Sequence, residues 1–433
     1  MRKRSKVFLL RILKKVTFPI ITIVIIGISF VPTVFHLKYY VFAFCLFALP
    51  FICTFSYKGA GIFHPGDLPL FAFLLLSGIN VFFARDLYVA CHAYLTITLP
   101  LFCLYYTLAT GIIYMKEFTI LSKVICISSI LVGSYALFEC FFSTNPIYEK
   151  MLPNEMFNHY IKIFTRPLST QGNPVVLGTY MLGSLAFHIP MLHVKKKKWW
   201  IAGFIGIIVS IVVILETLSR QVFIGLIGMG VVYYILRRKY KLLVSISCVF
   251  IALIIICSLL PHPFNRFGVQ GLFSNRARGI ISDYRLDRCV MTGKMLKDKP
   301  FTGIGLNHFR ILFDDYYSGK DSRNSFEFMI ADNMYLTIAA ETGIFGLLGF
   351  IALLLSIFFK IQKVFAVFSA DRYNRVVFTA LVSCLCGILL NMAAYELFYW
   401  PNQYVFLCLL IGFVEGLYRH TSKKRLSIQQ RSS

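Results

Sequence analysis

The residues of this chain best suited to chemistry are several arginines and one acidic residue at the start of an apolar run. The arginines are Arg166, Arg220 and Arg285, with Arg288 about one helical turn after Arg285. A guanidinium group binds phosphate through two parallel hydrogen bonds and stays charged at any relevant pH. Asp332 could accept a proton, more readily where desolvation raises its pKa. These residues predict an anionic ligand and acid–base chemistry.

Asp332 also has a second interpretation. It stands with Asn333 directly before an apolar run, and aspartate is a favoured N-terminal cap of a helix. The sequence is compatible with Asp332 as a catalytic residue and with Asp332 as a helix cap. Asn333, beside it, is a candidate substrate-binding residue.

Two glycine- or proline-containing steps could shape a binding site. The step Gly303-Ile304-Gly305 allows a tight backbone turn that could present N–H groups to a phosphate, although a simple loop turn fits the same residues. Asn173 precedes Pro174, which suits the first turn of a helix, and the asparagine can cap that helix. We therefore count Asn173, Gly303 and Gly305 among the candidate substrate-binding residues.

Further acidic residues and a histidine are weaker candidates. Glu139, Glu341 and Glu396 lie within or near the ends of apolar runs, where they could line a polar cavity or pair with the arginines. His308 is a reserve candidate for a base. The acidic pair at 314–315 could bind a divalent cation, but no further acidic residue stands at clear ligand spacing. We therefore predict no metal site and no cofactor.

The elements that must position these residues are membrane helices. The composition is 58% hydrophobic and 16% aromatic, and the mean hydropathy is +0.72, far outside the range of soluble domains. Apolar runs recur with close to the ~20 residues that a bilayer-spanning helix needs, and they lack the alternation of a membrane barrel. The runs predict twelve spans, roughly 16–35, 39–57, 67–84, 87–113, 117–142, 172–194, 199–215, 220–236, 242–260, 333–359, 376–396 and 402–418.

The basic residues orient these spans. Lysine and arginine cluster at the N-terminus, at 195–198, at 237–241, at 360–375 and in the C-terminal tail. With twelve spans all of these clusters lie on one side, which the positive-inside rule assigns to the cytoplasm together with both termini. We therefore predict an all-α polytopic membrane protein of about 12 transmembrane helices.

The predicted topology places two long loops on the outer face of one membrane domain, 1–433. The first outer loop is 143–171, and the large extracytoplasmic (periplasmic) loop, 261–332, joins helices 9 and 10. The net charge of +25 is mostly a consequence of topology, and basic juxtamembrane segments can hold anionic membrane lipids. Because the charge is spread over separate loops, the sequence argues against a nucleic-acid partner.

Arg220 stands out because its neighbouring spans are short. The apolar run that follows it, Gln221–Leu236, covers only ~24 Å against a hydrocarbon core of ~30 Å. The turn from Glu216 to Arg220 should therefore be drawn below the outer surface. A charge there costs a few kcal/mol unless it is paired or hydrated, so Arg220 is a functional candidate, although a Glu216–Arg220 pair could simply neutralise itself.

Three segments together resemble the O-antigen ligase/O-antigen polymerase superfamily of bacterial envelope enzymes. The first runs from Arg166 through Gly-Asn173-Pro174 to Gly178, and the second is Thr217-Leu-Ser-Arg220. The third runs from Arg285 through Lys299-Pro-Phe-Thr-Gly303-Ile-Gly305 to Asp332-Asn333 and Glu341-Thr-Gly343-Ile-Phe-Gly346. The resemblance covers about residues 160–360.

The resemblance implies a glycosyltransferase of the bacterial inner (plasma) membrane whose active site faces outward. Such enzymes transfer a glycan from a polyprenyl (undecaprenyl) diphosphate carrier to an acceptor glycan or glycolipid, without a metal and with inversion, in some cases beside other polysaccharide assembly proteins. It assigns catalysis to Asp332, Arg220 and Arg285, and substrate binding to Arg166, Arg288 and the residues named above.

The resemblance has one departure, and it leaves alternatives. The ligase branch resembles a pattern of His-Asn, nine residues, then Gly-x-x-Gly, whereas this chain has Asp332 in the place of the histidine. The departure favours a surface polysaccharide polymerase over a ligase that joins glycan to lipid A core. A polytopic transporter or glycolipid flippase would also explain the spans, but it explains the 261–332 loop poorly, and we find no similarity between the two halves of the chain.

Overall fold

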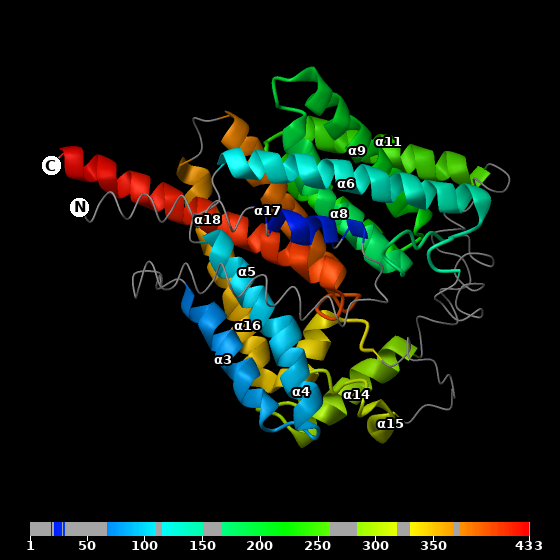
Figure 1. Ribbon diagram of the computed structural model, residues 1–433, viewed down its shortest axis with the longest axis vertical. Helices are drawn as coiled ribbons and strands as arrows, with labels where there is room; N and C mark the ends of the chain where they lie inside the picture. The colour runs from blue at the N-terminus through cyan, green and yellow to red at the C-terminus, as the bar shows by residue number, and fades with distance from the viewer. Residues whose placement is uncertain are drawn as a thin grey trace.

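The computed structural model describes residues 19, 21–27, 29–30, 67–109, 115–149, 166–259, 284–317, 330–367 and 372–432. Within these ranges every regular element is a helix (Figure 1). The helices are α3 (Leu68–Val81), α4 (Leu87–Ala93), the π-helix η4 (Tyr94–Thr98), α5 (Leu99–Ala109), α6 (Met115–Phe142), α8 (Pro174–Met191), α9 (Lys197–Glu216), α10 (Arg220–Leu236), α11 (Tyr240–Leu259), α14 (Tyr284–Asp298), α15 (Phe313–Tyr316), α16 (Met334–Val367), α17 (Arg372–Met392) and α18 (Pro401–Ser432).

Among the described residues, six stretches are long and apolar enough to cross a membrane, and α3 and α10 are apolar but shorter. Each span predicted between residues 67 and 418 coincides with a helix of the structure. The class of multi-pass helical membrane protein is therefore confirmed. The predicted spans 16–35 and 39–57 lie largely or wholly outside the described residues, and the total of twelve stays a prediction. The six stretches are Leu87–Ala109, Glu117–Phe142, Pro174–Met191, Lys197–Glu216, Met334–Phe365 and Arg372–Met392.

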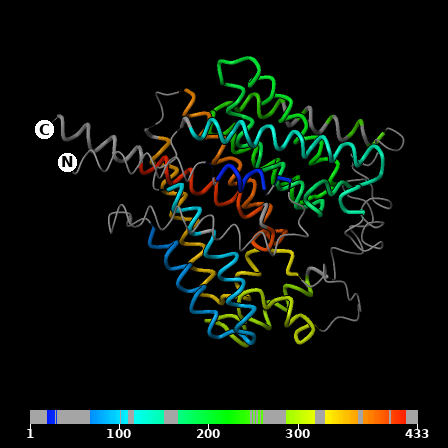
Figure 2. Tube along the Cα trace, viewed as in Figure 1, coloured from blue at the N-terminus to red at the C-terminus, as the bar shows by residue number. Residues whose placement is uncertain are grey.

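The helices pack as two groups joined by α17 and α18. In one group α8 packs against α6 and α9, and α10 packs against α17. The α10–α17 contact is close because a Cβ on Gly225 would lie 2.7 Å from the carbonyl oxygen of Gly387; small residues permit this approach between membrane helices. In the other group α16 packs against α3, and α18 packs against both α5 and α16. Figure 2 shows α18, in red, running between the two groups.

Several helices begin or end together at one end of the bundle, here called the site end. The helices α8, α10, α16 and α18 begin there, while α9 and α17 end there. Contacts between neighbours establish this alignment. Asn391 Nδ2 near the end of α17 donates to Thr179 Oγ1 in α8 at 2.6 Å. The Tyr335 hydroxyl at the start of α16 donates to the Leu389 carbonyl at 3.0 Å.

Helix α16 is broken at Gly343, and the segment 300–305 fills the break. Gly343 has φ +68° and ψ −173°, so the helix cannot continue its hydrogen bonds through this residue. The Ile304 N–H donates instead to the Ala340 carbonyl at 2.9 Å, and the Ile344 N–H donates to the Pro300 carbonyl at 2.9 Å. Asn80 of α3 completes the joint, because its Nδ2 donates to the Glu341 carbonyl at 2.7 Å. The break thereby anchors the start of α16.

The predicted 261–332 loop contains α14 and α15 in its described part, 284–317 and 330–332. Helix α14 packs directly against α16, and α15 packs against α14. Residues 261–283 and 318–329 of this loop lie outside the described ranges, as do residues 150–165 of the predicted loop 143–171.

Candidate active site

Asp332 lies immediately before α16 and forms an ion pair with Arg288 of α14. The distance from Arg288 Nη1 to Asp332 Oδ2 is 2.9 Å, and the arginine side chain is 1% exposed whereas the aspartate is 12% exposed. The backbone of Asp332 is left-handed, with φ +51°, a conformation that costs energy and is concentrated at functional sites. The buried guanidinium therefore orients a carboxylate that still reaches the surface.

Asn333, the next residue, provides the helix cap that the sequence offered to Asp332. Asn333 Oδ1 accepts hydrogen bonds from the N–H groups of Tyr335 at 3.0 Å and Leu336 at 3.2 Å. The interpretation of Asp332 as the helix cap is therefore wrong, because the next residue, Asn333, is the cap. Asp332 has a positive φ, and its side chain points toward α14 instead. This cap also gives Asn333 a structural function.

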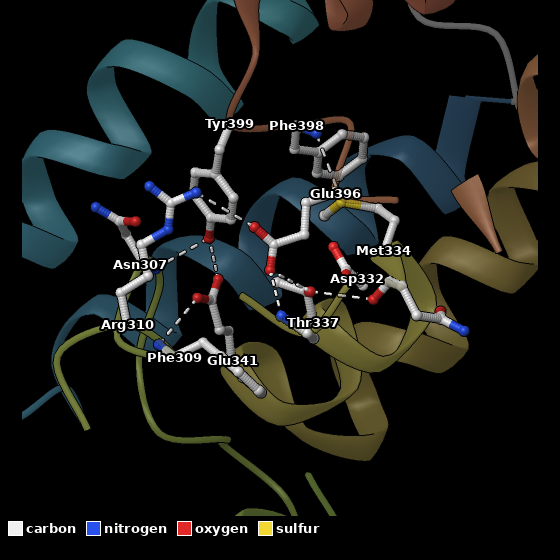
Figure 3. A network of polar contacts seen from close by, with 12 residues as sticks. Asn307, Phe309, Arg310, Asp332, Met334, Thr337, Glu341, Glu396, Phe398 and Tyr399 are labelled. Atoms are coloured by element: carbon white, nitrogen blue, oxygen red, sulfur yellow. Dashed lines mark hydrogen bonds and ion pairs between the residues drawn. The ribbon is translucent and has the colours of Figure 1, made fainter. Parts of the chain in front are cut away.

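Glu396, in the segment 393–400 between α17 and α18, lies beside Asp332 in Figure 3. Its Oε1 accepts from the Ala331 N–H at 2.9 Å and from the Thr337 hydroxyl at 3.0 Å. Its Oε2 lies 3.5 Å from Arg310 Nη2. Burial raises the pKa of the Glu396 carboxyl, and the Arg310 guanidinium opposes that rise. Glu396 thus pairs with an arginine, but with Arg310 and not with one of the arginines singled out from the sequence.

Glu341 and Tyr399 extend this network. The Tyr399 hydroxyl donates to Glu341 Oε2 and accepts from the Asn307 N–H at 3.1 Å. Glu341 Oε1 accepts from the Phe309 N–H at 3.2 Å. Burial, followed by the nearby Glu341 charge, raises the pKa of Tyr399 well above its ordinary value. The Arg310 guanidinium lies over the Tyr399 ring at 5.8 Å from its centroid, so the two carboxylates share one connected polar network.

Both ring nitrogens of His308, the weaker candidate for a base, form hydrogen bonds with the backbone. Its Nε2 accepts from the Asp86 N–H at 2.9 Å and its Nδ1 lies 2.8 Å from the Leu306 carbonyl oxygen. Since Nε2 accepts, Nδ1 must carry the proton. The imidazole is fully buried, so it holds the 305–308 turn against α4 and does not face a substrate.

The N–H groups of the glycine step are also occupied. The Gly303 N–H donates to the Lys299 carbonyl at 3.0 Å and the Gly305 N–H donates to the Glu341 carbonyl at 3.1 Å. The N–H groups of Ile304 and Gly305 bond to the carbonyls at the break in α16, and the Gly303 N–H closes the turn that follows α14. The expectation that Gly303 and Gly305 present N–H groups to a phosphate is therefore wrong. Their positive φ angles of +69° and +114° serve the joint.

Arg166 and Arg220 form a second, cationic part of the site end. Arg166 Nε donates to the Thr217 carbonyl at 2.7 Å and Nη2 donates to Ser219 Oγ at 3.1 Å. Arg220 opens α10 beside that turn. Arg220 is half-buried and makes no hydrogen bond or ion pair with the residues that the structure describes. Arg166 therefore bonds to the same turn from which α10 starts at Arg220.

Hydrogen bonds from Glu139 and Asn173 fix the backbone that follows Arg166. Glu139 near the end of α6 accepts from the N–H groups of Leu168 at 2.9 Å and Ser169 at 2.6 Å. Asn173 Oδ1 accepts from the Val175 N–H at 2.8 Å, with Pro174 at the first helical position. The predicted cap of α8 is thus confirmed, and it occupies the Asn173 carbonyl oxygen.

The last turn of α17 connects the carboxylate network at the start of α16 with the turn that carries Arg166 and Arg220. On one side Leu389 accepts from Tyr335, and on the other Asn391 donates to Thr179. Thr179 follows Gly178, whose Cβ position would lie 3.2 Å from Thr217 Oγ1, beside Arg166. The cationic turn at 217–220 and the carboxylates at the start of α16 therefore flank the same helix end.

Two other expectations concern Arg285 and the acidic pair 314–315. Arg285 lies in the first turn of α14, but its side chain is outside the described residues. Asp315 pairs with the exposed Arg85 at 2.6 Å. Among the described residues no group of three or more histidine, cysteine or acidic side chains could hold a metal ion.

Arg310 and Tyr399 are the site residues that sequence reasoning missed. Arg310 sits between Gly305 and the acidic pair, and only its charge in a membrane-proximal loop could have signalled it. Tyr399 lies in the aromatic segment Phe398-Tyr399-Trp400, which reads as an ordinary interfacial anchor. Their contacts with Glu396 and Glu341 come from the tertiary fold alone.

The fold and these clusters define a multi-pass helical membrane protein with a group of buried carboxylates and arginines at one end of its bundle. A protein-family model described as O-Antigen ligase matches residues 205–351. The matched segment contains Arg220, Arg288 and Asp332, and the match confirms the similarity to the O-antigen ligase/polymerase superfamily. It supports a membrane enzyme of the ligase or polymerase kind. No curated protein matches the sequence of this chain.

Proposed function

We propose that this protein is a membrane glycosyltransferase that moves a glycan from a polyprenyl (undecaprenyl) diphosphate carrier to an acceptor sugar hydroxyl, as a surface polysaccharide polymerase. The observation that carries the proposal is the Asp332–Arg288 pair: a partly exposed carboxylate oriented by a buried guanidinium. A base held by a second group is the arrangement that activates a hydroxyl nucleophile.

In the proposed reaction the acceptor hydroxyl attacks the sugar carbon that bears the diphosphate. A bond forms between the acceptor oxygen and that carbon, and the bond from carbon to the diphosphate oxygen breaks. Asp332 takes the hydroxyl proton. The polyprenyl diphosphate leaves with the bonding electrons, and cationic side chains stabilise its added charge. Attack opposite the leaving group inverts the sugar carbon.

We assign Arg220 as the cation that stabilises the leaving diphosphate. It is half-buried, and its guanidinium is not consumed by another described residue, whereas Arg166 already bonds to the 217–219 turn. Arg288 takes a different role from the one first assigned: because it is buried against Asp332, it orients the base and does not bind the substrate. Arg285 keeps its predicted role as a further cation.

A ligase that joins finished glycan to lipid A core or another acceptor is the second candidate, favoured by the description of the matching family. One experiment separates the two activities. Arg220→Ala, Arg285→Ala and Asp332→Asn are expressed singly, and the surface glycan is resolved on a gel. Loss of the long ladder with one repeat unit retained identifies a polymerase. Loss of all attached glycan, with lipid-linked polymer accumulating, identifies a ligase. Three variants with a wild-type ladder would refute the site.

A further inference from the structure

The segment 393–400 between α17 and α18 belongs to the site although it lies beyond the family match at 205–351. Glu396 from this segment is 1% exposed, so its carboxylate cannot touch a substrate. Its carboxylate contacts the Ala331 N–H, the Thr337 hydroxyl and the Arg310 guanidinium (Figure 3).

Glu396 holds the chain on both sides of Asp332. One residue before Asp332, the Ala331 N–H donates to Glu396 Oε1 at 2.9 Å. Five residues after it, the Thr337 hydroxyl in the first turn of α16 lies 3.0 Å from the same oxygen. A single carboxylate oxygen therefore links the incoming chain to the helix, with Asp332 at the bend between them.

The bend needs such a link because Asp332 has φ +51°. A non-glycine residue in the left-handed region persists where its surroundings over-determine it. Arg288 fixes the side chain of Asp332, but the peptide before it has Glu396 as its anchor. Arg310 lies 3.5 Å from the other Glu396 oxygen and holds that carboxylate in turn.

We propose that Glu396 is a positioning residue that holds Asp332 in its reactive geometry, an inference that rests on the proposed function. A general base acts within hydrogen-bond reach of the proton it takes, about 2.6–3.2 Å. A displacement of about 1 Å lowers a rate by roughly 10²-fold. The 393–400 segment thus completes a site whose other residues lie in the family-like region.

The test is a double-mutant cycle for transfer by purified protein in proteoliposomes, with undecaprenyl-diphosphate-linked glycan extracted from cells as donor. Rates are counted per folded molecule. We expect Glu396→Ala to lower kcat by roughly 10–100-fold with KM little changed. Glu396→Gln should recover most of this loss, because its amide oxygen still accepts from Ala331. Asp332→Asn should lower the rate by about 10²–10⁴-fold, and adding Glu396→Ala to it should lower it no further.

The matched control is Glu415→Ala, which removes another buried carboxylate of similar exposure far from Asp332, between Lys360 and Arg419. Its effect per folded molecule should be small, and it should combine multiplicatively with Asp332→Asn. Hydrogen exchange at the Ala331 amide supplies a direct readout: Glu396→Ala should speed it, and Glu415→Ala should not.

The outcomes separate the two proposals. If Asp332→Asn transfers glycan like the wild type, the proposed function fails. If Asp332→Asn is impaired but Glu396→Ala multiplies its loss, or leaves Ala331 exchange unchanged, Glu396 does not act through Asp332 and this inference fails.

Discussion

The Arg288–Asp332 pair should be worth far more to stability than a surface ion pair of similar length. At 2.9 Å and an effective dielectric constant of about 20, the attraction between the two charges is about 6 kcal/mol. Part of this offsets the desolvation of a guanidinium that is 1% exposed. Removing one partner leaves the other charge buried and uncompensated, which costs about 3–5 kcal/mol. We therefore expect Arg288→Met and Asp332→Asn each to destabilise the protein by about this amount.

The double variant distinguishes the structural role from the chemical one. Arg288→Met with Asp332→Asn removes both charges, so most of the lost stability should return. Transfer activity should not return, because the carboxylate is absent. Asparagine tolerates the left-handed backbone at position 332, so the Asp332→Asn change adds no large backbone strain. Stability is measured by unfolding of the detergent-solubilised protein, and activity by glycan transfer.

The exposed pair Arg85–Asp315 is the control. Its atoms lie 2.6 Å apart, but the side chains are 66% and 55% exposed. Breaking it with Arg85→Met should change stability by no more than about 1 kcal/mol. Equal losses for Arg288→Met and Arg85→Met would refute the argument from burial. A double variant that transfers glycan normally would refute Asp332 as the base.

Three further predictions test the supports of the site. Gly343→Ala should abolish correct folding of the α16 joint, because φ is +68° and a Cβ would lie 2.3 Å from the Phe301 carbonyl oxygen. Gly230→Ala is the control and should be harmless, because nothing lies within 4 Å of its Cβ position. The yield of monodisperse protein measures both effects. Asn333→Ala should cost about 1 kcal/mol of stability through the lost cap, and Asn333→Asp should restore most of it in the same unfolding assay. Tyr399→Phe should lower the free energy of unfolding by about 1–3 kcal/mol, because Glu341 and the Asn307 N–H lose a buried partner. An unchanged unfolding midpoint would show that the bond to Glu341 contributes little.

The helices follow from the sequence because the bilayer leaves a hydrophobic segment few alternatives. A chain in hydrocarbon must satisfy its backbone groups internally, so each apolar run from residue 67 onward coincides with a helix. The start of α10 at Arg220 follows from the same rule, because the apolar run begins directly after this charged residue. The start of α8 was also predictable from local residues alone, because Asn173 caps the helix and Pro174 occupies its first position.

The carboxylate network was not predictable in the same way. Whether Asp332 or Asn333 caps α16 depends on the backbone at position 332, where φ is +51° and the side chain pairs with Arg288 of a different helix. The N–H groups of Ile304 and Gly305 go to the Ala340 and Glu341 carbonyls, which the break at Gly343 frees. Spacing along the chain contains no information about these partners, because each pair comes from separate segments.

The aspartate at position 332, where the ligase-like pattern has a histidine, has a physical explanation in Arg288. A guanidinium buried to 1% exposure requires an anion beside it. A neutral histidine at that position would leave the arginine uncompensated, and a protonated one would repel it. Aspartate satisfies the arginine and still presents a proton acceptor at the surface. The departure from the pattern is therefore coupled to the arginine on α14, and the two residues should be treated as one unit when the mechanism of this protein is compared with that of ligases.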